Sequence, residues 1–246
     1  MKILILAAGY GTRLYKISKD TPKPLLTVGQ RPLIDHLLDK VNHMKNLKEL
    51  IVVTNNKFEK NFIEWSKQVK GFPAPITVVN DGTNTPEERL GSIGDMAYVL
   101  DHHPVDDDLL VMGGDNLFDY RLDQYLVFAG QKAPHVSIGL YDIGRIEEAS
   151  KFGVVEVDGQ GKVVSFEEKP EKPKSSLVAM CFYYFPRASL PLIGKYLAVN
   201  HKADKAGDYI RWLTEESTVY GFKFEGKWYD IGSVESYYEA QEKFKS

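Results

Sequence analysis

Two motifs near the start of the sequence place glycines and cations where a phosphate could bind. Residues 9–13 read Gly-Tyr-Gly-Thr-Arg, and Lys23 follows between Pro22 and Pro24. Glycines allow the backbone to approach a phosphate closely and to present its N–H groups. The guanidinium of Arg13 is a fixed fork of donors that suits phosphate oxygens, and the prolines stiffen the backbone that carries the Lys23 ammonium. Together the two motifs predict a binding site for a phosphorylated ligand.

The glycine run differs from two familiar phosphate-binding loops. A dinucleotide-binding loop would need a third glycine at the position of Leu14. A Walker A loop would end in Gly-Lys-Ser or Gly-Lys-Thr, and the run has no such ending. We therefore expect a phosphate site of another kind, the alternative being a tight turn flanked by solvated cations.

Two acidic turns further along the chain supply carboxylates that a metal ion could use. Asp115 follows the apolar run 109–112 and two glycines, and Asp230 lies in the run 228–232, Trp-Tyr-Asp-Ile-Gly. A carboxylate at the end of a strand, beside a phosphate loop, can hold Mg²⁺, which prefers carboxylate and phosphate oxygens. Taken alone, Asp115 is also compatible with an Asp-Asn turn, and Asp230 is better explained as the turn before a helix.

Hydrophobic patterning predicts the elements that position these motifs. Short apolar runs rich in β-branched residues are typical of buried parallel strands, and segments with helical spacing lie between them. This alternation indicates βαβ units and a doubly wound sheet. The predicted strands cover residues 3–6, 50–54, 76–79 and 109–112, and the apolar faces of the intervening helices begin at Leu33, Phe58 and Ile93.

The second half of the sequence has a mixed pattern. Residues 158–161, Asp-Gly-Gln-Gly, predict a hairpin turn. We expect one α/β domain over residues 1–246, a Rossmann-like three-layer sandwich whose mostly parallel sheet is extended by antiparallel strands. No Pro-, Gly- or Ser-rich linker separates its two halves, 1–118 and 119–246. The strands predicted here cover residues 154–157, 163–167, 178–185, 219–224 and 228–231, with helices around 190–197 and after Ser233.

Composition excludes several classes of protein. Lys and Arg number 31 and Asp and Glu 34, so the formal net charge of −3 argues against a nucleic-acid partner. The single cysteine, Cys181, rules out a disulfide framework, and its apolar neighbours favour a place in the core. No apolar run is long enough to span a membrane, and the opening run is too short for a signal peptide. We expect a cytoplasmic enzyme or small-molecule binder.

The glycine loop and the Pro-Lys-Pro motif together resemble the signature of the sugar-phosphate nucleotidyltransferases, also called nucleoside-diphosphate-sugar pyrophosphorylases. The likeness is greatest to glucose-1-phosphate thymidylyl- and uridylyltransferases, and the motifs occur in the family's order across nearly the whole chain. The resemblance implies a Mg²⁺-dependent reaction in which a sugar 1-phosphate attacks a nucleoside triphosphate and pyrophosphate leaves. It also implies a nucleotide-binding half, 1–118, a sugar-phosphate-binding half, 119–246, and a tendency to form homo-oligomers.

The resemblance further implies roles for individual residues. Arg13, Lys23 and Lys169 correspond to catalytic cations, and Asp115 and Asp230 to metal ligands. Glu168 would accept hydrogen bonds from sugar hydroxyls, and the other residues of the acceptor site would be Asn116, Gly153, Lys169 and Ala179. The nucleotide-binding residues would be Leu6, Ala8, Gly9, Gly11, Thr12, Arg13, Lys23, Asn80, Gly91 and Ser92.

The nucleobase segment departs from the family pattern and leaves the substrate pair open. The third strand ends in Asn80 where thymidylyltransferases usually carry Gln. The Asn80 amide could still pair with a pyrimidine edge, and Gly91 and Ser92 could form a wall over the base. The alternatives are a cytidylyltransferase for choline phosphate or another small phosphate, and a non-catalytic relative that binds a sugar nucleotide. A glycosyltransferase ranks lower, because it would not require the glycine loop with Pro-Lys-Pro.

Overall fold

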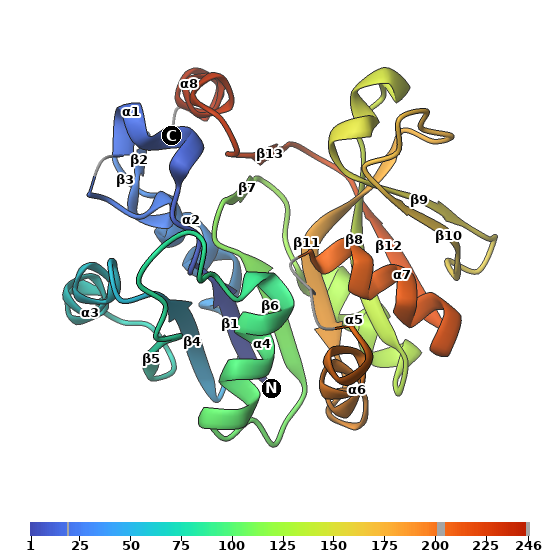
Figure 1. The fold of residues 1–246 in the computed structure, drawn as a ribbon, viewed down its shortest axis with the longest axis horizontal. Coiled ribbons are helices and arrows are strands. Elements are labelled where there is room, and N and C mark those ends of the chain that lie inside the picture. The colour runs from blue at the N-terminus through green and yellow to red at the C-terminus, as the bar shows by residue number, and fades with distance from the viewer. Residues whose placement is uncertain (19, 201–204, 245–246) are drawn as a thin grey trace.

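A single mixed β-sheet runs through the centre of the molecule (Figure 1). The computed structural model describes residues 1–18, 20–200 and 205–244. Four strands of the first half are parallel to one another, in the spatial order β6-β1-β4-β5. They are β1 (Lys2–Leu6), β4 (Glu49–Thr54), β5 (Ile76–Asn80) and β6 (Leu109–Gly113).

The second half extends this sheet with antiparallel strands. The junction is β11 (Leu177–Phe185), which pairs antiparallel with β6, β8 and β9. The outer strands are β8 (Val136–Asp142), β9 (Gly153–Val157), β10 (Val163–Glu168) and β12 (Val219–Phe224). The predicted α/β class, with a parallel sheet extended by antiparallel strands, is confirmed.

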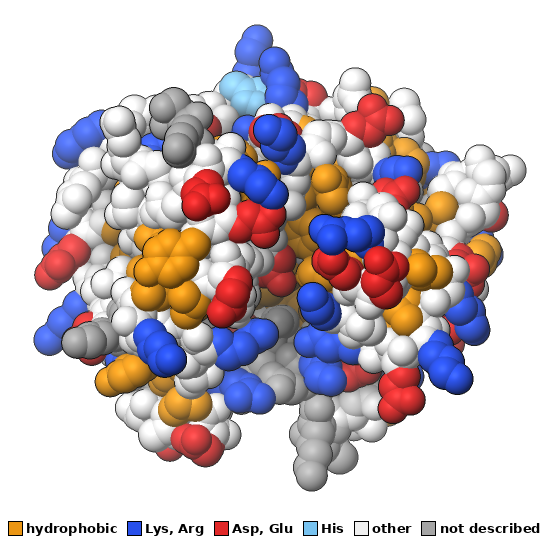
Figure 2. All heavy atoms as spheres, turned by 90° about the horizontal axis from the view of Figure 1, so that it is seen from above, with side chains coloured by type: hydrophobic (Ala, Val, Ile, Leu, Met, Phe, Trp, Pro, Cys, Tyr) orange, Lys and Arg blue, Asp and Glu red, His pale blue; other side chains and the backbone are white. Residues whose placement is uncertain are grey.

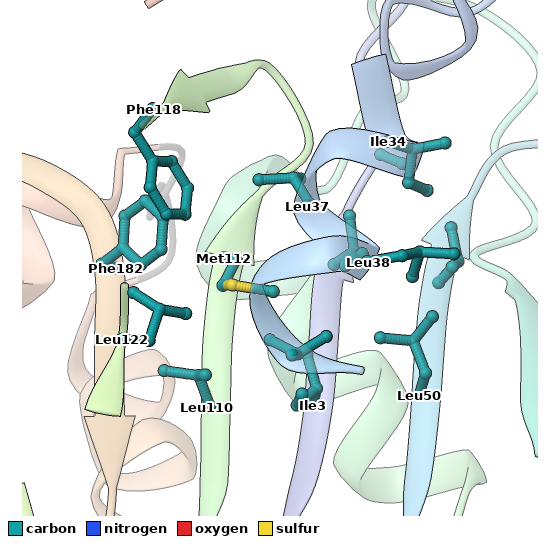
Figure 3. Close-up of a cluster of buried hydrophobic side chains, with 14 of the residues drawn as sticks. Ile3, Ile34, Leu37, Leu38, Leu50, Leu110, Met112, Phe118, Leu122 and Phe182 are labelled. Carbon is teal, nitrogen blue, oxygen red and sulfur yellow. The ribbon is translucent and has the colours of Figure 1, made fainter. Parts of the chain in front are cut away.

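Helices cover both faces of the sheet, so the strands are buried on two sides. In β1, Ile3 and Ile5 face one core and Leu4 faces the other. Figure 3 shows the first core, where Ile3, Leu50 and Leu110 of the strands pack near Leu37 and Leu38. The helices are α1 (Tyr15–Ser18), α2 (Leu33–Val41), α3 (Glu59–Gln68), α4 (Gly91–His102), α5 (Asp123–Lys132), α6 (Pro191–Val199), α7 (Ala206–Glu216) and α8 (Val234–Lys243), with 3-10 turns at Thr12–Leu14, Lys23–Leu25, Ile146–Lys151 and Arg187–Ser189.

Two short ribbons lie beyond the carboxyl ends of the parallel strands. In one of them β7 (Asn116–Phe118) pairs antiparallel with β13 (Trp228–Asp230), which ties a loop of the first half to the end of the second. The other joins β2 (Thr27–Val28) to β3 (Arg31–Pro32). Ser233 caps α8 as predicted, since its side chain accepts from the backbone N–H of Ser236.

Residues 119–150 and 206–216 form elements that the sequence patterns did not predict, namely α5, β8 and α7. Among the described residues, no helix is long and apolar enough to cross a membrane.

Glu49, the first residue of β4, holds together the opposite end of the sheet. Its half-buried carboxylate accepts from Lys2 at 2.9 Å, from Thr77 at 2.6 Å and from His103 at 2.9 Å. Burial by itself would raise the pKa of this carboxyl, but the hydrogen bonds from Thr77, His103 and Lys2 outweigh it and lower the pKa to about 2.

We expect Glu49→Gln to lower the free energy of unfolding by about 2 kcal/mol at pH 7, the scale of hydrogen bonds to a charged group. A depressed pKa stabilises the fold above the unfolded pKa of about 4.5 and stops doing so as pH falls toward 2. The difference between wild type and variant should therefore shrink between pH 5 and pH 3 in urea titrations, on the ordinary scale of carboxyl titration. Glu167→Gln, which removes an exposed ion pair with Lys174, is the control and should change stability little. A difference that stays the same at both pH values would contradict the assignment.

Candidate active site

A cleft of 600 Å³ lies between the two halves of the chain, at the carboxyl ends of β1 and β6. Figure 2 looks onto the molecule from above and shows this hollow, with both blue and red side chains around it. Ligands of open α/β sheets bind at this edge. The predicted site residues that line the cleft come from both halves: Leu6, Gly9, Gly11, Thr12, Arg13, Lys23, Ser92, Asp115, Asn116, Gly153, Glu168, Lys169, Ala179 and Asp230.

The glycine loop forms one wall of the cleft and is held in place by its neighbours. Gly11 has a φ of 64°, in the left-handed region where glycine is at no disadvantage. The Asn55 amide donates to the carbonyl of Ala8 at 2.7 Å, and the Tyr10 hydroxyl donates to Thr83 at 3.0 Å. A side chain at Gly9 would meet open space, so a ligand can approach the backbone there. The loop is thus a fixed surface rather than a free turn.

Lys23 and Asp115 form an ion pair at the centre of the cleft. The Lys23 ammonium lies 2.9 Å from Oδ2 of Asp115, and the two side chains are 17% and 33% exposed. Gly114, which precedes Asp115, lies against Pro24 and the carbonyl of Leu6, so closely that a Cβ there would clash with both. The Pro-Lys-Pro motif therefore packs directly on the acidic turn.

Asp230 enters the same place from the other half of the chain. In the β7–β13 ribbon it stands opposite Asn116, and the next residue, Ile231, donates its N–H to the carbonyl of Asp115 at 3.0 Å. Burial and the negative charge of Asp115 raise the pKa of Asp230 to about 6, although the positive charges of Lys23 and Arg13 oppose them. The two predicted acidic residues are thus close enough to repel each other.

This pair fits the chemistry of a magnesium site completed by substrate. The described residues contain no group of three or more His, Cys, Asp or Glu side chains that could enclose a metal by themselves. Mg²⁺ usually binds through one or two carboxylates together with water and substrate phosphates. Asp115 and Asp230 offer such a pair, and a bound cation would relieve the repulsion that raises the pKa of Asp230.

The end of the cleft that the second half of the chain forms is built around Glu168. Burial raises the pKa of Glu168, with the charge of Lys169 opposing it. Its carboxylate lies against Gly207, in the first turn of α7, where any Cβ would overlap it. Gly153 lies between the Phe166 ring and the same carboxylate, and a Cβ there would also clash. The two glycines leave room for the carboxylate of Glu168 at the cleft.

Lys169 adopts an unusual backbone conformation at this end. Its φ of 50° makes it the one non-glycine residue with a positive φ among those described. Left-handed geometry costs a non-glycine residue roughly 1 kcal/mol or more and tends to occur at functional sites. The N–H of Lys169 donates to the carbonyl of Phe152 at 3.0 Å, which fixes the turn that aims the ammonium.

Three residues predicted to bind nucleotide lie outside the lining of the cleft that the structure describes. They are Ala8, Asn80 and Gly91. The Ala8 carbonyl is taken by Asn55, and the Asn80 amide is engaged with the Asn56 side chain at 2.6 Å and the Gly82 N–H at 2.9 Å. Two residues that were not predicted, Tyr10 and Arg89, line the cleft together with the predicted Ser92.

Sequence reasoning also missed cations at the Glu168 end of the cleft. Lys151 and Lys205, both exposed, line the cleft together with Lys169. Lys151 lies two residues before Gly153, which the family resemblance had singled out, and this closeness in sequence is the signal that could have found it. Lys205 stands before α7, a helix that the patterns did not predict.

Cys181 packs against one of the hydrophobic cores, as expected, and it also lines the cleft. Burial and the nearby charge of Asp115 raise the pKa of its thiol to about 12, so the sulfur is not a nucleophile at neutral pH.

Two curated relatives match nearly the whole chain. The chain is 27% identical over 237 residues to the bifunctional protein GlmU of Methanocaldococcus jannaschii, covering 94% of this chain and 51% of that protein. It is 28% identical over 232 residues to the GlmU of Methanococcus aeolicus, with the same coverage. The chain thus spans about half the length of the curated relatives it matches.

Two solved structures share the fold over nearly their whole length. A structure assigned to a glucose-1-phosphate thymidylyltransferase of Bacillus anthracis superposes with a TM-score of 0.82 at 24% identity, covering 100% of this chain and 96% of that one. A UDP-glucose pyrophosphorylase complexed with UDP-glucose gives 0.80 at 22% identity, covering 99% and 97%. The sequence model of the nucleotidyl transferases matches residues 2–246, and the chain therefore belongs to the nucleotidyl transferase family.

Proposed function

We propose that the chain transfers a nucleotidyl group from a nucleoside triphosphate to a sugar 1-phosphate and releases pyrophosphate. One observation carries the proposal: Lys23, Asp115 and Asp230 meet in the cleft, with the glycine loop on one side and Lys169 on the other. In this proposal residues 1–246 form one catalytic unit, in which 1–118 bind the nucleotide and 119–246 bind the acceptor.

The reaction needs no covalent intermediate on the protein. A phosphate oxygen of the acceptor attacks the α-phosphorus in line, a new P–O bond forms, and the bond to pyrophosphate breaks. Transfers of this kind depend mainly on positioning and on neutralising charge. The cleft offers both, because cations from separate elements surround its centre. The Cys181 thiol, whose pKa is raised, takes no part.

Each cation has its own place along the reacting phosphates. Arg13, at the end of the glycine loop, stabilises the charge that develops on the leaving pyrophosphate. Lys23 binds at the α-phosphate, and Lys169 holds the phosphate of the acceptor. The backbone at Gly9 and Gly11 approaches the triphosphate, since no side chain intervenes there.

Asp115 and Asp230 would hold Mg²⁺ in this reaction. When bound, the ion would neutralise phosphate charge and help to orient the triphosphate. The Lys23 ammonium, 2.9 Å from Oδ2 of Asp115, holds that carboxylate in place at the cleft.

The charge of the acceptor end favours a sugar phosphate over choline phosphate. Phe152 and Trp228 could stack against a trimethylammonium group, but Lys151, Lys169 and Lys205 line the same region and would repel it. The named relatives and structural neighbours include a UDP-glucose pyrophosphorylase and a thymidylyltransferase, which supports a pyrimidine nucleotide.

A pyrophosphate-release screen tests the proposal. It would cross dTTP, UTP, CTP, GTP and ATP with glucose 1-phosphate, other sugar 1-phosphates and choline phosphate, each with Mg²⁺. Release with a sugar 1-phosphate supports the proposal, and release with choline phosphate alone supports the alternative acceptor. If calorimetry shows that the protein binds a sugar nucleotide but no substrate pair releases pyrophosphate, the result would favour the alternative of a non-catalytic relative.

We expect Lys23→Ala to lower kcat at least about tenfold, which corresponds to a loss of about 1.4 kcal/mol of transition-state stabilisation. The change removes positive charge at the α-phosphate and leaves the two carboxylates without their neutralising partner. The matched control is Lys223→Ala on β12, which breaks a 3.0 Å ion pair with Asp142 at the end of β8. A folded Lys23→Ala protein with a nearly normal rate would contradict the role.

Lys169→Gln should separate acceptor binding from nucleotide binding. We expect KM for the sugar phosphate to rise by about tenfold, because a charge-assisted contact to phosphate is lost, while KM for the nucleotide changes less than about twofold. Steady-state kinetics with each substrate varied in turn would check this. An equal rise in both KM values would show that Lys169 is not specific to the acceptor.

A further inference from the structure

Asn116 lies beside Asp115 at the cleft, but its amide is used inside the protein. The side chain is 2% exposed. Its Nδ2 donates to the Gly113 carbonyl at 3.1 Å and lies 3.4 Å from Oδ1 of Asp115. Its Oδ1 accepts from the indole N–H of Trp228 at 2.7 Å. A role in holding these groups fits this amide better than the direct substrate contact that the family resemblance implies.

The indole N–H determines which way the Asn116 amide points. The indole nitrogen can only donate, so the amide must turn its oxygen toward Trp228. The NH₂ group then faces the Gly113 carbonyl and the Asp115 carboxylate, both of which are acceptors. Without the indole N–H, the amide oxygen would lose its donor, and only the two acceptors on the NH₂ side would hold the amide in place.

Trp228 is well placed to transmit this effect between the halves. It begins β13, and in the β7–β13 ribbon Trp228 pairs with Phe118 and Asp230 with Asn116. Because side chains alternate along a strand, Trp228 and Asp230 lie on the same face of this ribbon. The indole ring also contacts Phe152, whose ring centre is 5.6 Å away and which precedes Gly153 at the acceptor end.

We propose that Trp228 and Asn116 are positioning residues for the metal-binding carboxylate. The indole N–H fixes the amide of Asn116, and the amide fixes the carboxylate of Asp115, whose other oxygen is held by Lys23. The inference builds on the proposed function, because it concerns how the same Asp115 is prepared to hold a divalent cation. Hydrogen bonds behind metal ligands typically change metal affinity by 10–100-fold when they are removed.

Trp228→Phe tests the inference with a small change. Phenylalanine keeps an aromatic ring against Phe152 and removes the N–H. The matched control is Trp65→Phe, because the Trp65 indole also donates to a side-chain oxygen, that of Asp35 at 2.8 Å, between α3 and α2 and away from the cleft. Both variants lose the same kind of bond at different places.

The experiment measures the binding of Mn²⁺ to each folded protein in the absence of nucleotide and acceptor. Electron paramagnetic resonance detects the ion that remains free. We expect Trp228→Phe to raise the Mn²⁺ dissociation constant by about tenfold and Trp65→Phe to leave it within about twofold. Thermal melting would confirm that both proteins are folded. Because no turnover is measured, this result stands apart from the outcome of the substrate screen.

A double-mutant cycle with Asn116→Ala separates a shared path from two independent effects. If Trp228 acts through Asn116, the double variant should bind Mn²⁺ no more weakly than the weaker single variant. Three results would overturn the inference: unchanged Mn²⁺ affinity in Trp228→Phe, equal weakening in Trp65→Phe, or no Mn²⁺ binding by the wild type. Fully additive losses in the cycle would overturn the path through Asn116.

Discussion

Two carboxylates that share one cleft repel each other, and much of this structure serves to hold them there. Asp115 lies two residues beyond the end of the parallel strand β6, and Asp230 is the last residue of β13, in the other half of the chain. Burial raises the pKa of Asp230, and the negative charge of Asp115 raises it further. Backbone bonds of the β7–β13 ribbon prevent the pair from separating, and Lys23 offsets part of the charge. Because the two carboxylates repel each other, a divalent cation bound between them would lower the electrostatic energy of the site.

The strands and the local motifs could be predicted from the sequence because their signals are short-range. β12 coincides with its predicted range, and the other predicted strands are correct to within one residue at each end. The glycine loop, Lys23, Asp115 and Asp230 were identified from residue types and from the resemblance. Their proximity in the structure could not be predicted from their separation in the sequence, because it depends on strand pairing between residues 116–118 and 228–230. Such distant pairing leaves no periodic trace in a single sequence.

Two of the residues predicted to bind nucleotide have polar groups that the fold satisfies internally. Asn80 ends the predicted strand, and an amide at that position can recognise a base, but its neighbours Asn56 and Gly82 take up the amide. Likewise, the Ala8 carbonyl is satisfied by Asn55, which stabilises the loop instead of contacting a ligand. Sequence alone does not tell which polar groups the fold will satisfy internally. Arg89 lines the cleft from a segment without a clear pattern, so its place had to come from the structure.

The contact between Glu168 and Gly207 has a mechanical consequence. The carboxylate fills the space that a methyl group at position 207 would need, so it cannot shift toward α7 unless the whole helix moves. That helix is anchored by Tyr209, Ile210 and Leu213, which are fully buried in the second core. The Glu168 end of the cleft is therefore stiff in the direction of the helix and can yield only toward the open cleft. A ligand that draws Glu168 toward itself would meet little resistance, whereas one that pushes against it would have to deform the core.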